Sequence, residues 1–353
     1  MIGVDGGKGR LIVTLTISND NSPKPKIKNT AAKKTTVVAC VSGIPENYEN
    51  MAIIVDKLKL NQFSKDIKMV ADLKLINILN GLQSSSSTYP CAYGKCKKPT
   101  KLSGWVKGED RTIQNILIDQ ESWETSTNKN RSQLKNFFNA ESKPLITSQP
   151  EKRVMDIFPP PPLHLVKLGA LNKVYGELGK LVDLEPFEKS INIVKSTYHG
   201  GNFESNECGK ILNNITKLEE HVKACDQKYL PFINVIWFLR LIDNIVNLPK
   251  LEPGYKEVIE SFKDSYKILE LEFNVSVTNK VHIITDHLAE YMERNEATLL
   301  KTTDQTVECT HSKLDRFLKE HGYFRKNNDN VSSGVKLFNG ILAWNSYVLN
   351  DKK

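Results

Sequence analysis

The sequence contains few cysteines, six in 353 residues. Such sparse usage excludes a disulfide scaffold, and a reducing compartment would keep most of these side chains as thiols. The chain also has no run of about 18 uninterrupted apolar residues, which a membrane-spanning helix would need. Its first ten residues, MIGVDGGKGR, do not form the apolar segment of a secretory signal. We therefore expect an intracellular protein that has no association with a membrane.

The overall composition is that of an ordinary globular protein, with 39% hydrophobic and 25% charged residues. The length allows one large domain or two smaller ones. Lysine and arginine outnumber aspartate and glutamate by 49 to 41. A surplus of this size suits a polyanionic partner, but it also occurs in proteins that bind nothing charged.

The first third of the chain has the patterns of a small sheet with two helices. Apolar and β-branched runs predict four strands, at residues 1–5, 10–18, 35–43 and 67–71. Apolar residues at helical spacing predict helices at 47–60 and 73–83. The glycines between the first two runs indicate a hairpin.

The rest of the chain is polar at first and then helical. Residues 97–160 show weak periodicity and predict loops and short elements, and the proline run at 159–163 predicts a stiff boundary. Beyond it, three-to-four spacing of apolar residues predicts a helical block. Its helices are expected at 164–182, 204–225, 229–248 and 254–273, with two more at 286–300 and 304–321. A weakly amphipathic tail covers residues 338–350, and no internal repeat is visible.

Two aspartates follow predicted strands and give the first chemical signal. Asp5 ends the first strand and Asp72 follows the fourth. If those strands are neighbours, the two carboxylates point to one place and repel each other unless a cation joins them. Magnesium prefers such oxygen ligands. Two ions about 4 Å apart could activate a water molecule and stabilise the leaving oxygen of a phosphodiester.

The strand order and these aspartates resemble the ribonuclease H-like fold of DDE transposases and recombinases. That resemblance implies a third acid on a late helix, and Glu308 is the candidate. The alternative is that all three acids are ordinary surface or turn residues. Cys309 and His311 lie beside Glu308 and could be metal ligands, but we interpret them as helix-face residues.

Two pairs of residues suggest a zinc site. Cys91 and Cys96 stand close together, and His282 and His287 form a second pair in HIITDH. Paired cysteines and histidines are typical structural zinc ligands. Residues five apart on an ideal helix differ by about 140° in direction, so we expect His282 to precede a helix that begins near Thr285. The alternative is two unrelated thiols and two ordinary helix histidines.

Taken in order, these motifs resemble the catalytic subunit of the V(D)J recombinase and its Transib-type transposase relatives. The resemblance rests on the spacing from Asp72 to Cys91, on STYPC, on HIITDH and on VECTHSKLDRF. It implies a mixed α/β, ribonuclease H-like core that is split by a large, mainly helical insertion and followed by C-terminal helices. It implies catalytic acids at Asp5, Asp72 and Glu308, and zinc ligands at Cys91, Cys96, His282 and His287.

The same resemblance implies an activity, cofactors and partners. A DDE enzyme would nick double-stranded DNA and transfer the strand with the freed 3′ hydroxyl, using Mg²⁺ or Mn²⁺ at the acids and a structural Zn²⁺. A homodimer is expected, with a nuclear location if the source is eukaryotic. The implied organisation is a first core part at 1–83, a zinc half-site and polar connection at 84–160, a helical insertion at 161–275, and a final part at 276–353 with the second half-site and the third acid.

The sequence departs from the family pattern in two ways. Four residues separate Cys91 from Cys96, where the family has two. Only four residues precede Asp5, so we expect the N-terminal DNA-recognition modules of the relatives to be absent. Five lysines could touch phosphates without reading sequence, or form a solvated loop. They are Lys24, Lys26, Lys28, Lys33 and Lys34.

Two rival interpretations remain open. The opening IGVDGGKG resembles the first phosphate loop of the sugar-kinase and actin-like fold, although no later glycine-rich adenosine loop follows and the P-loop spacing is not met. The other rival is a zinc-stabilised remnant that binds DNA or a partner and has no activity.

Overall fold

The structure is a computed structural model that describes residues 1–7, 10–16, 35–62, 67–99, 104–195, 202–323 and 333–350. The chain divides into two compact units. The first unit contains residues 1–84, 111–159 and 302–353, and the second contains 85–110 and 160–301. The five lysines between residues 24 and 34 lie outside the described residues.

A four-stranded mixed sheet forms the centre of the first unit. Its strands are β1 (Ile2–Gly7), β2 (Arg10–Thr16), β3 (Thr35–Ser42) and β4 (Met69–Val70), in the spatial order β3-β2-β1-β4. β2 pairs antiparallel with both β1 and β3, which confirms the predicted hairpin. β1 and β4 are parallel neighbours. β1 continues past Asp5 to Gly7, so the aspartate lies within the strand and not at its end.

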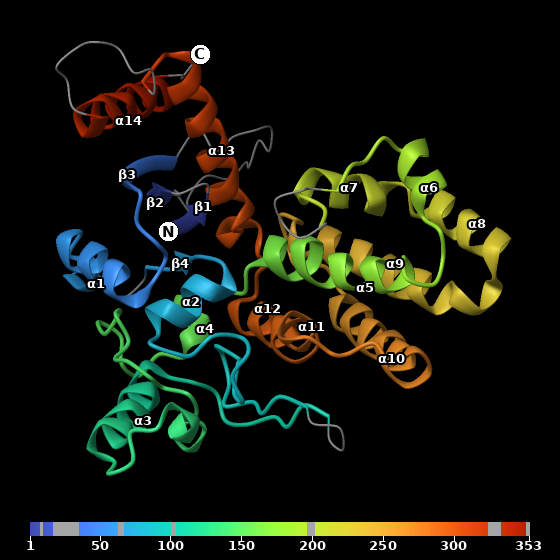
Figure 1. Cartoon of the computed structure of the whole chain (residues 1–353), viewed down its shortest axis with the longest axis horizontal. Helices are drawn as coiled ribbons and strands as arrows, with labels where there is room; N and C mark the ends of the chain where they lie inside the picture. The colour runs from blue at the N-terminus through green and yellow to red at the C-terminus, as the bar shows by residue number, and fades with distance from the viewer. Residues whose placement is uncertain are drawn as a thin grey trace. The chain divides into compact units, whose positions relative to one another are not determined.

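Two C-terminal helices cover one face of this sheet (Figure 1). They are α13 (Gln305–Glu320) and α14 (Ser333–Asn350). Ile12 of β2 is buried in a cluster with Leu314, Leu318 and Trp344. The side chain of Asn345 also bonds both the N–H and the carbonyl of Val37, at 2.9 Å each. α14 therefore packs on the sheet and also satisfies polar groups of β3.

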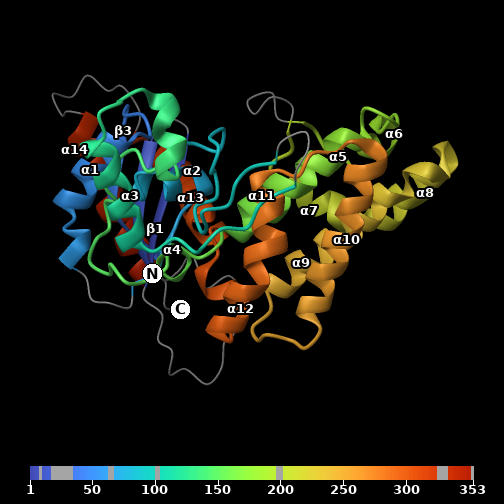
Figure 2. The same ribbon diagram turned by 90° about the horizontal axis from the view of Figure 1, so that it is seen from below.

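The first unit contains further helices, which are labelled in Figure 2. They are α1 (Tyr48–Lys57), α2 (Leu73–Leu79), α3 (Ile113–Thr125) and α4 (Val154–Ile157), with short 3₁₀ turns at Leu60–Gln62 and Arg131–Phe137. α3 falls in a region that was predicted to hold loops and short elements. Ile113 and Ile116 are its only buried apolar residues, and a Thr112–Asn115 capping box begins it. A helix with so narrow an apolar face leaves little periodic signal.

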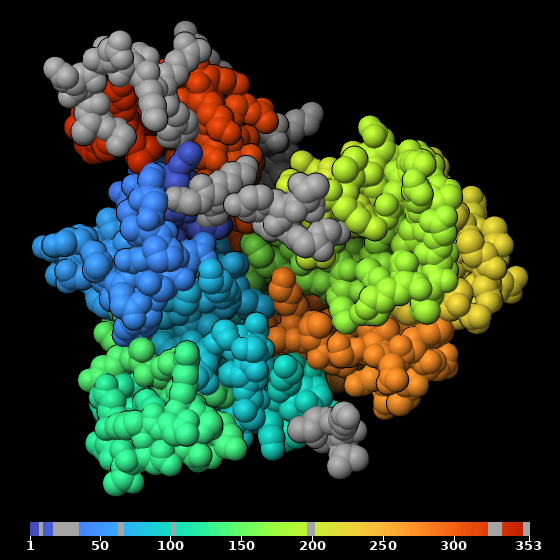
Figure 3. Space-filling model, in the orientation of Figure 1, coloured from blue at the N-terminus to red at the C-terminus, as the bar shows by residue number. Residues whose placement is uncertain are grey.

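The outer side of α14 carries several exposed apolar side chains. Phe338, Leu342 and Tyr347 are 60%, 50% and 58% exposed. The two C-terminal helices are the red elements of the space-filling view (Figure 3). The inner side of α14, with Trp344 and Val348, is buried. The weak amphipathicity of this segment in the sequence thus reflects apolar residues on both sides of the helix.

The second unit is predominantly helical. Its helices are α5 (Asn172–Leu178), α6 (Glu185–Ser190), α7 (Ser205–Asn213), α8 (Ile215–Cys225), α9 (Leu230–Val246), α10 (Tyr255–Phe273), α11 (Asn279–Ile283) and α12 (Ala289–Asn295). The π-helical segment η4 (Leu163–Leu171) continues into α5. A second π-helical segment, η6 (Ile284–Leu288), connects α11 to α12. Short 3₁₀ turns lie at Gln227–Tyr229 and Leu300–Thr302. The helix predicted at 204–225 is two helices that meet at Asn214.

α9 lies at the centre of the second unit. It packs against α10, α8, α7, α5 and η4. Residues Gln227–Val246 form the one helix in the described part of the chain that is long and apolar enough to cross a membrane, and 39% of its apolar window is buried within the protein. A core helix passes the same test of length and composition, so this helix alone does not establish a membrane span.

Candidate functional site

The two predicted pairs of zinc ligands lie together in the second unit. Cys91 and Cys96 come from the irregular stretch 85–99, His282 from α11 and His287 from η6. All four side chains are buried, and one ligand atom of each lies within 4.8 Å of the others. Nε2 of His287 is 3.3 Å from Sγ of Cys91 and 3.9 Å from Sγ of Cys96. Two thiols and two imidazoles are a suitable donor set for tetrahedral zinc, so this cluster could hold such a metal.

The position of His282 corrects the sequence prediction. His282 lies inside α11, not before the helix, and the helix continues through η6 to His287. The predicted separation of 140° assumed regular α-helical geometry. A π-helical turn is wider and bonds each residue to the fifth one along. The π-helical segment therefore brings side chains five apart toward the same side of the helix.

The cysteine segment is shaped to approach the histidines closely. A Cβ atom at Gly94 would lie 2.8 Å from Sγ of Cys96, so only glycine leaves room for that thiol. The amide of Lys95 donates to the carbonyl of Glu109 at 2.8 Å, which closes the segment on itself. The side chain of Asn279, at the start of α11, donates to the carbonyl of Pro90 at 3.1 Å. These bonds hold the thiol pair against the histidine helix.

The electrostatics of the cluster favour a thiolate. The pKa of Cys96 is lowered to about 2, chiefly by the hydrogen bond with Cys91 and also by the neighbouring imidazoles of His282 and His287, which together outweigh the effect of burial. Burial and the neighbouring Cys96 raise the pKa of Cys91 well above its ordinary value. A bound cation would favour the charged form of both thiols, because thiolate is the form that ligates zinc.

The candidate catalytic acids all belong to the first unit but have separate local partners. Asp5 lies in β1 opposite Ile12, and its carboxylate is bonded to Nδ1 of His311 at 2.6 Å. Asp72 caps α2, where its Oδ1 accepts from the amide of Leu75 at 2.7 Å. Glu308 is half-buried in the first turn of α13. His311 was interpreted only as a helix-face residue, and its contact with Asp5 links residues 306 apart in sequence.

The strand register relates Asp5 to Asp72. Ile2 of β1 pairs with Met69 of β4, and Gly3 pairs with Val70. Asp5 lies two residues after Gly3, and Asp72 lies two residues after Val70. α13 comes very close to the same strand, since a Cβ on Gly3 would lie 2.4 Å from Cγ2 of Val307. Glu308 is the next residue of α13. β1, the start of α2 and the start of α13 therefore carry the three acids in one region of the first unit.

These acids do not form a preformed magnesium site. Among the described residues, the clusters whose ligand atoms lie within 4.8 Å of one another are the cysteine and histidine group and a second group of Asp110, His287 and Glu290. Asp5, Asp72 and Glu308 are not such a group. Carboxylate oxygen is the right kind of ligand for Mg²⁺ or Mn²⁺. In this structure the ligand atoms of the three acids do not lie within 4.8 Å of one another, so the arrangement itself gives no support for bound Mg²⁺ or Mn²⁺.

His311 lies among several carboxylates. Burial alone would lower its pKa, but the hydrogen bond with Asp5 and the charges of Asp5, Asp315 and Glu308 raise it above the ordinary value. Asp315, one turn later on α13, forms an ion pair with Arg10 of β2. The buried side of α13 is thus unusually polar, and its charged groups are paired with β1 and β2.

The glycines of the opening IGVDGGKG have a structural use in the described part of the motif. A Cβ on Gly6 would overlap the side chain of Glu46, whose Oε1 lies 1.5 Å from that position. Glu46 also accepts from Nζ of Lys74 at 2.6 Å. An acidic side chain against Gly6 is unfavourable for phosphate, so this contact opposes the sugar-kinase interpretation. Residues 8–9 lie outside the described residues.

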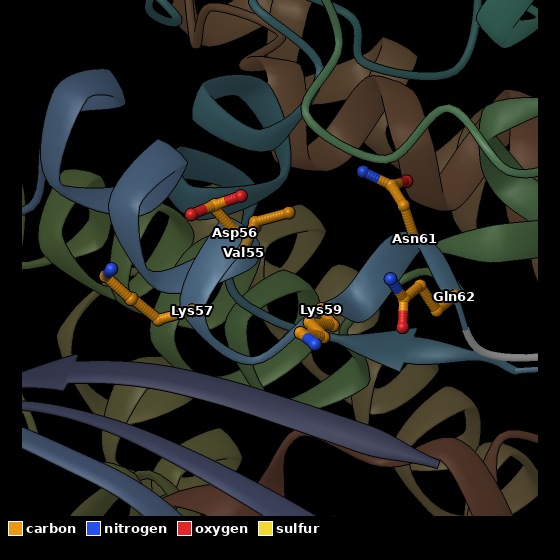
Figure 4. Close-up of a pocket in the computed structure, with 6 residues that line it drawn as sticks. All are labelled: Val55, Asp56, Lys57, Lys59, Asn61 and Gln62. Carbon is orange, nitrogen blue, oxygen red and sulfur yellow. The ribbon is translucent and has the colours of Figure 1, made fainter.

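A pocket of about 320 Å³ lies elsewhere in the first unit, around the end of α1 (Figure 4). Its lining comes from one short segment of the chain: Val55, Asp56, Lys57, Lys59, Asn61 and Gln62. It contains none of the predicted site residues. With both amino and carboxylate groups on its walls, it indicates no particular ligand.

Comparison with known proteins leaves the family open. No protein-family model matches this chain, and no curated protein matches it.

Proposed function

We propose that this chain is a DDE-type DNA transposase or recombinase core that resembles the Transib-type transposases and the catalytic subunit of the V(D)J recombinase. The observation that carries the proposal is the parallel register of the neighbouring strands β1 and β4. Asp5 and Asp72 each stand two residues beyond the paired residues Gly3 and Val70. In the ribonuclease H-like fold the first and fourth strands carry catalytic acids at this place. Asp5, Asp72 and Glu308 are the candidate acids.

The approach of α13 to the sheet supports the same proposal. Gly3 leaves room for Val307, and Glu308 follows it directly. A third acid from a late helix beside the first strand is what the family pattern requires. The cysteine and histidine cluster adds further support, because a cysteine pair before the helical segment and a histidine pair after it match the order of zinc ligands in these relatives.

The test is DNA nicking by the purified full-length chain. Supercoiled plasmid in Mg²⁺ or Mn²⁺ should be converted to nicked circles by the wild type and not by Asp72→Asn. Asparagine caps helices as well as aspartate does, so this variant removes the charge and keeps the cap of α2. Equal nicking by the two proteins would identify a contaminating nuclease and reject the assignment.

A second candidate is a zinc-stabilised remnant that binds DNA or a partner without cleaving it. The observation that favours it is the separation of the three acids, which do not gather within 4.8 Å in the described residues. The same experiment separates the two functions. Retained DNA binding with no nicking in either metal would favour the remnant.

A further inference from the structure

His282 has a carboxylate partner of its own. Its Nδ1 lies 2.6 Å from Oδ2 of Asp286, four residues along the same helix. The other ring nitrogen, Nε2, is buried and has no hydrogen-bond partner among the described residues. With the proton on Nδ1 and shared with Asp286, the lone pair of Nε2 is available to a metal. The carboxylate thus selects the tautomer that a zinc ligand needs.

Trp105 fixes the plane of the same imidazole. The two rings are stacked, with centroids 4.0 Å apart and an interplanar angle of 2°. The indole is held in turn, because its Nε1 donates to the carbonyl of Val277 at 3.1 Å. Trp105 limits tilting of the ring, and Asp286 limits its rotation within the ring plane. His282 is therefore oriented from two directions.

The second histidine is held differently. Nδ1 of His287 is buried without a hydrogen-bond partner among the described residues, although carboxylates of Asp110 and Glu290 lie within 4.8 Å of the ligand atom of His287. The ring of His287 meets the ring of His282 edge-on, at 5.1 Å between centroids, and the ring of Tyr93 lies 5.8 Å away, so no ring is stacked on its face as Trp105 is on His282 among the described residues. His282 is thus the pre-oriented imidazole of the pair.

We propose that Asp286 is a positioning residue of the metal cluster, which orients His282 so that Nε2 meets the ion held by Cys91, Cys96 and His287. This role depends only on the cluster and not on the proposed DNA cleavage. Asp286 also makes a longer ion pair with Lys263, at 3.2 Å. That second contact provides a matched control, because it can be removed while the bond to His282 stays.

The test measures the zinc affinity of the full-length chain by competition with a chromophoric chelator. Asp286→Ala should lower the affinity about 10- to 100-fold, the usual effect of removing a hydrogen-bond partner of a ligating histidine. Asp286→Asn keeps a neutral acceptor and should lose less zinc affinity than Asp286→Ala does. Lys263→Ala should bind zinc as the wild type does. Substituting Co²⁺ for zinc gives a second measurement, since a misoriented His282 should alter the visible absorption of the tetrahedral ion.

Each outcome decides the proposal. Wild-type affinity in Asp286→Ala would overturn it, and so would an equal loss in Lys263→Ala, which would assign the effect to the surface ion pair. If Asp286→Ala does not fold, Asp286→Asn decides by the same measurements. A wild-type chain that binds no zinc would overturn both the cluster and the positioning role.

Discussion

Nδ1 of His311 on α13 lies 2.6 Å from Oδ2 of Asp5 on β1, and both side chains are buried. The contact joins the first strand to the C-terminal part of the chain. It also gives one oxygen of a candidate catalytic acid a fixed partner. The raised pKa of His311 means that the imidazole favours its charged form beside this carboxylate.

Replacing His311 should reveal the value of this contact. His311→Leu keeps an apolar group of similar size but removes the donor, so Asp5 loses its partner at a buried position. We expect the free energy of unfolding to fall by about 1.5–3 kcal/mol, the range for a hydrogen bond to a charged group. His311→Asn keeps a donor near the position of Nδ1 and should lose less of the free energy of unfolding than His311→Leu does. Urea denaturation without added divalent metal measures the free energy of unfolding of both variants. A smaller loss in His311→Leu than in His311→Asn would show that packing, and not the hydrogen bond, dominates at this position.

Removal of zinc should destabilise the second unit. Structural zinc can supply much of the folding free energy of its site. A chelator, or the variant Cys91→Ser, should lower the melting temperature and the far-UV helical signal. The wild type should contain about one zinc per chain by elemental analysis, as expected for one four-ligand site. Cys225→Ser is the control, because that cysteine is exposed.

Acidification should have a similar effect on metal content. Zinc requires deprotonated thiols and neutral imidazoles, so its affinity falls as these ligands gain protons. Zinc retention measured across a series of pH values should therefore fall toward acid pH. Retention that does not change with pH would argue against cysteine and histidine ligands.

Asp72 has a structural task that must be separated from any catalytic one. Its side chain caps α2 through Leu75. Asp72→Ala should cost about 1 kcal/mol of stability, the typical loss for an N-cap residue, whereas Asp72→Asn should cost little. Thermal or urea unfolding distinguishes the two variants. Equal losses would mean that the charge, and not the cap, is what stabilises this position.

The close contact of β1 and α13 can be tested at Gly3. A Cβ there would lie 2.4 Å from Val307 and 2.5 Å from Oγ1 of Thr14. Gly3→Ala should therefore destabilise the protein by about 1–3 kcal/mol through overpacking. Combining it with Val307→Ala should cost less than the sum of the single changes, because the second change makes room. Additive losses in a double-mutant cycle would show that the helix and strand are not in contact.

Local patterns predicted much of the first unit. The β-branched runs and the turn between them were enough for the hairpin of β1 and β2, because alternation and turn chemistry act over a few residues.

In the second unit, the helices at 229–248 and 254–273 were predicted close to their limits, since both carry a long apolar stripe. α3 was missed because its apolar face consists of two residues.

The sequence by itself determined which side chains can ligate a metal and that Cys91, Cys96, His282 and His287 form two close pairs. Only the tertiary structure decided that the pairs meet, and that a π-helical segment directs both histidines to the same place. It also decided that Asp5 is held by His311 and that β1, α2 and α13 carry the three acids in one region of the first unit. Ligand type is a property of each residue alone, whereas these contacts join residues far apart in sequence and depend on how strands and helices pack.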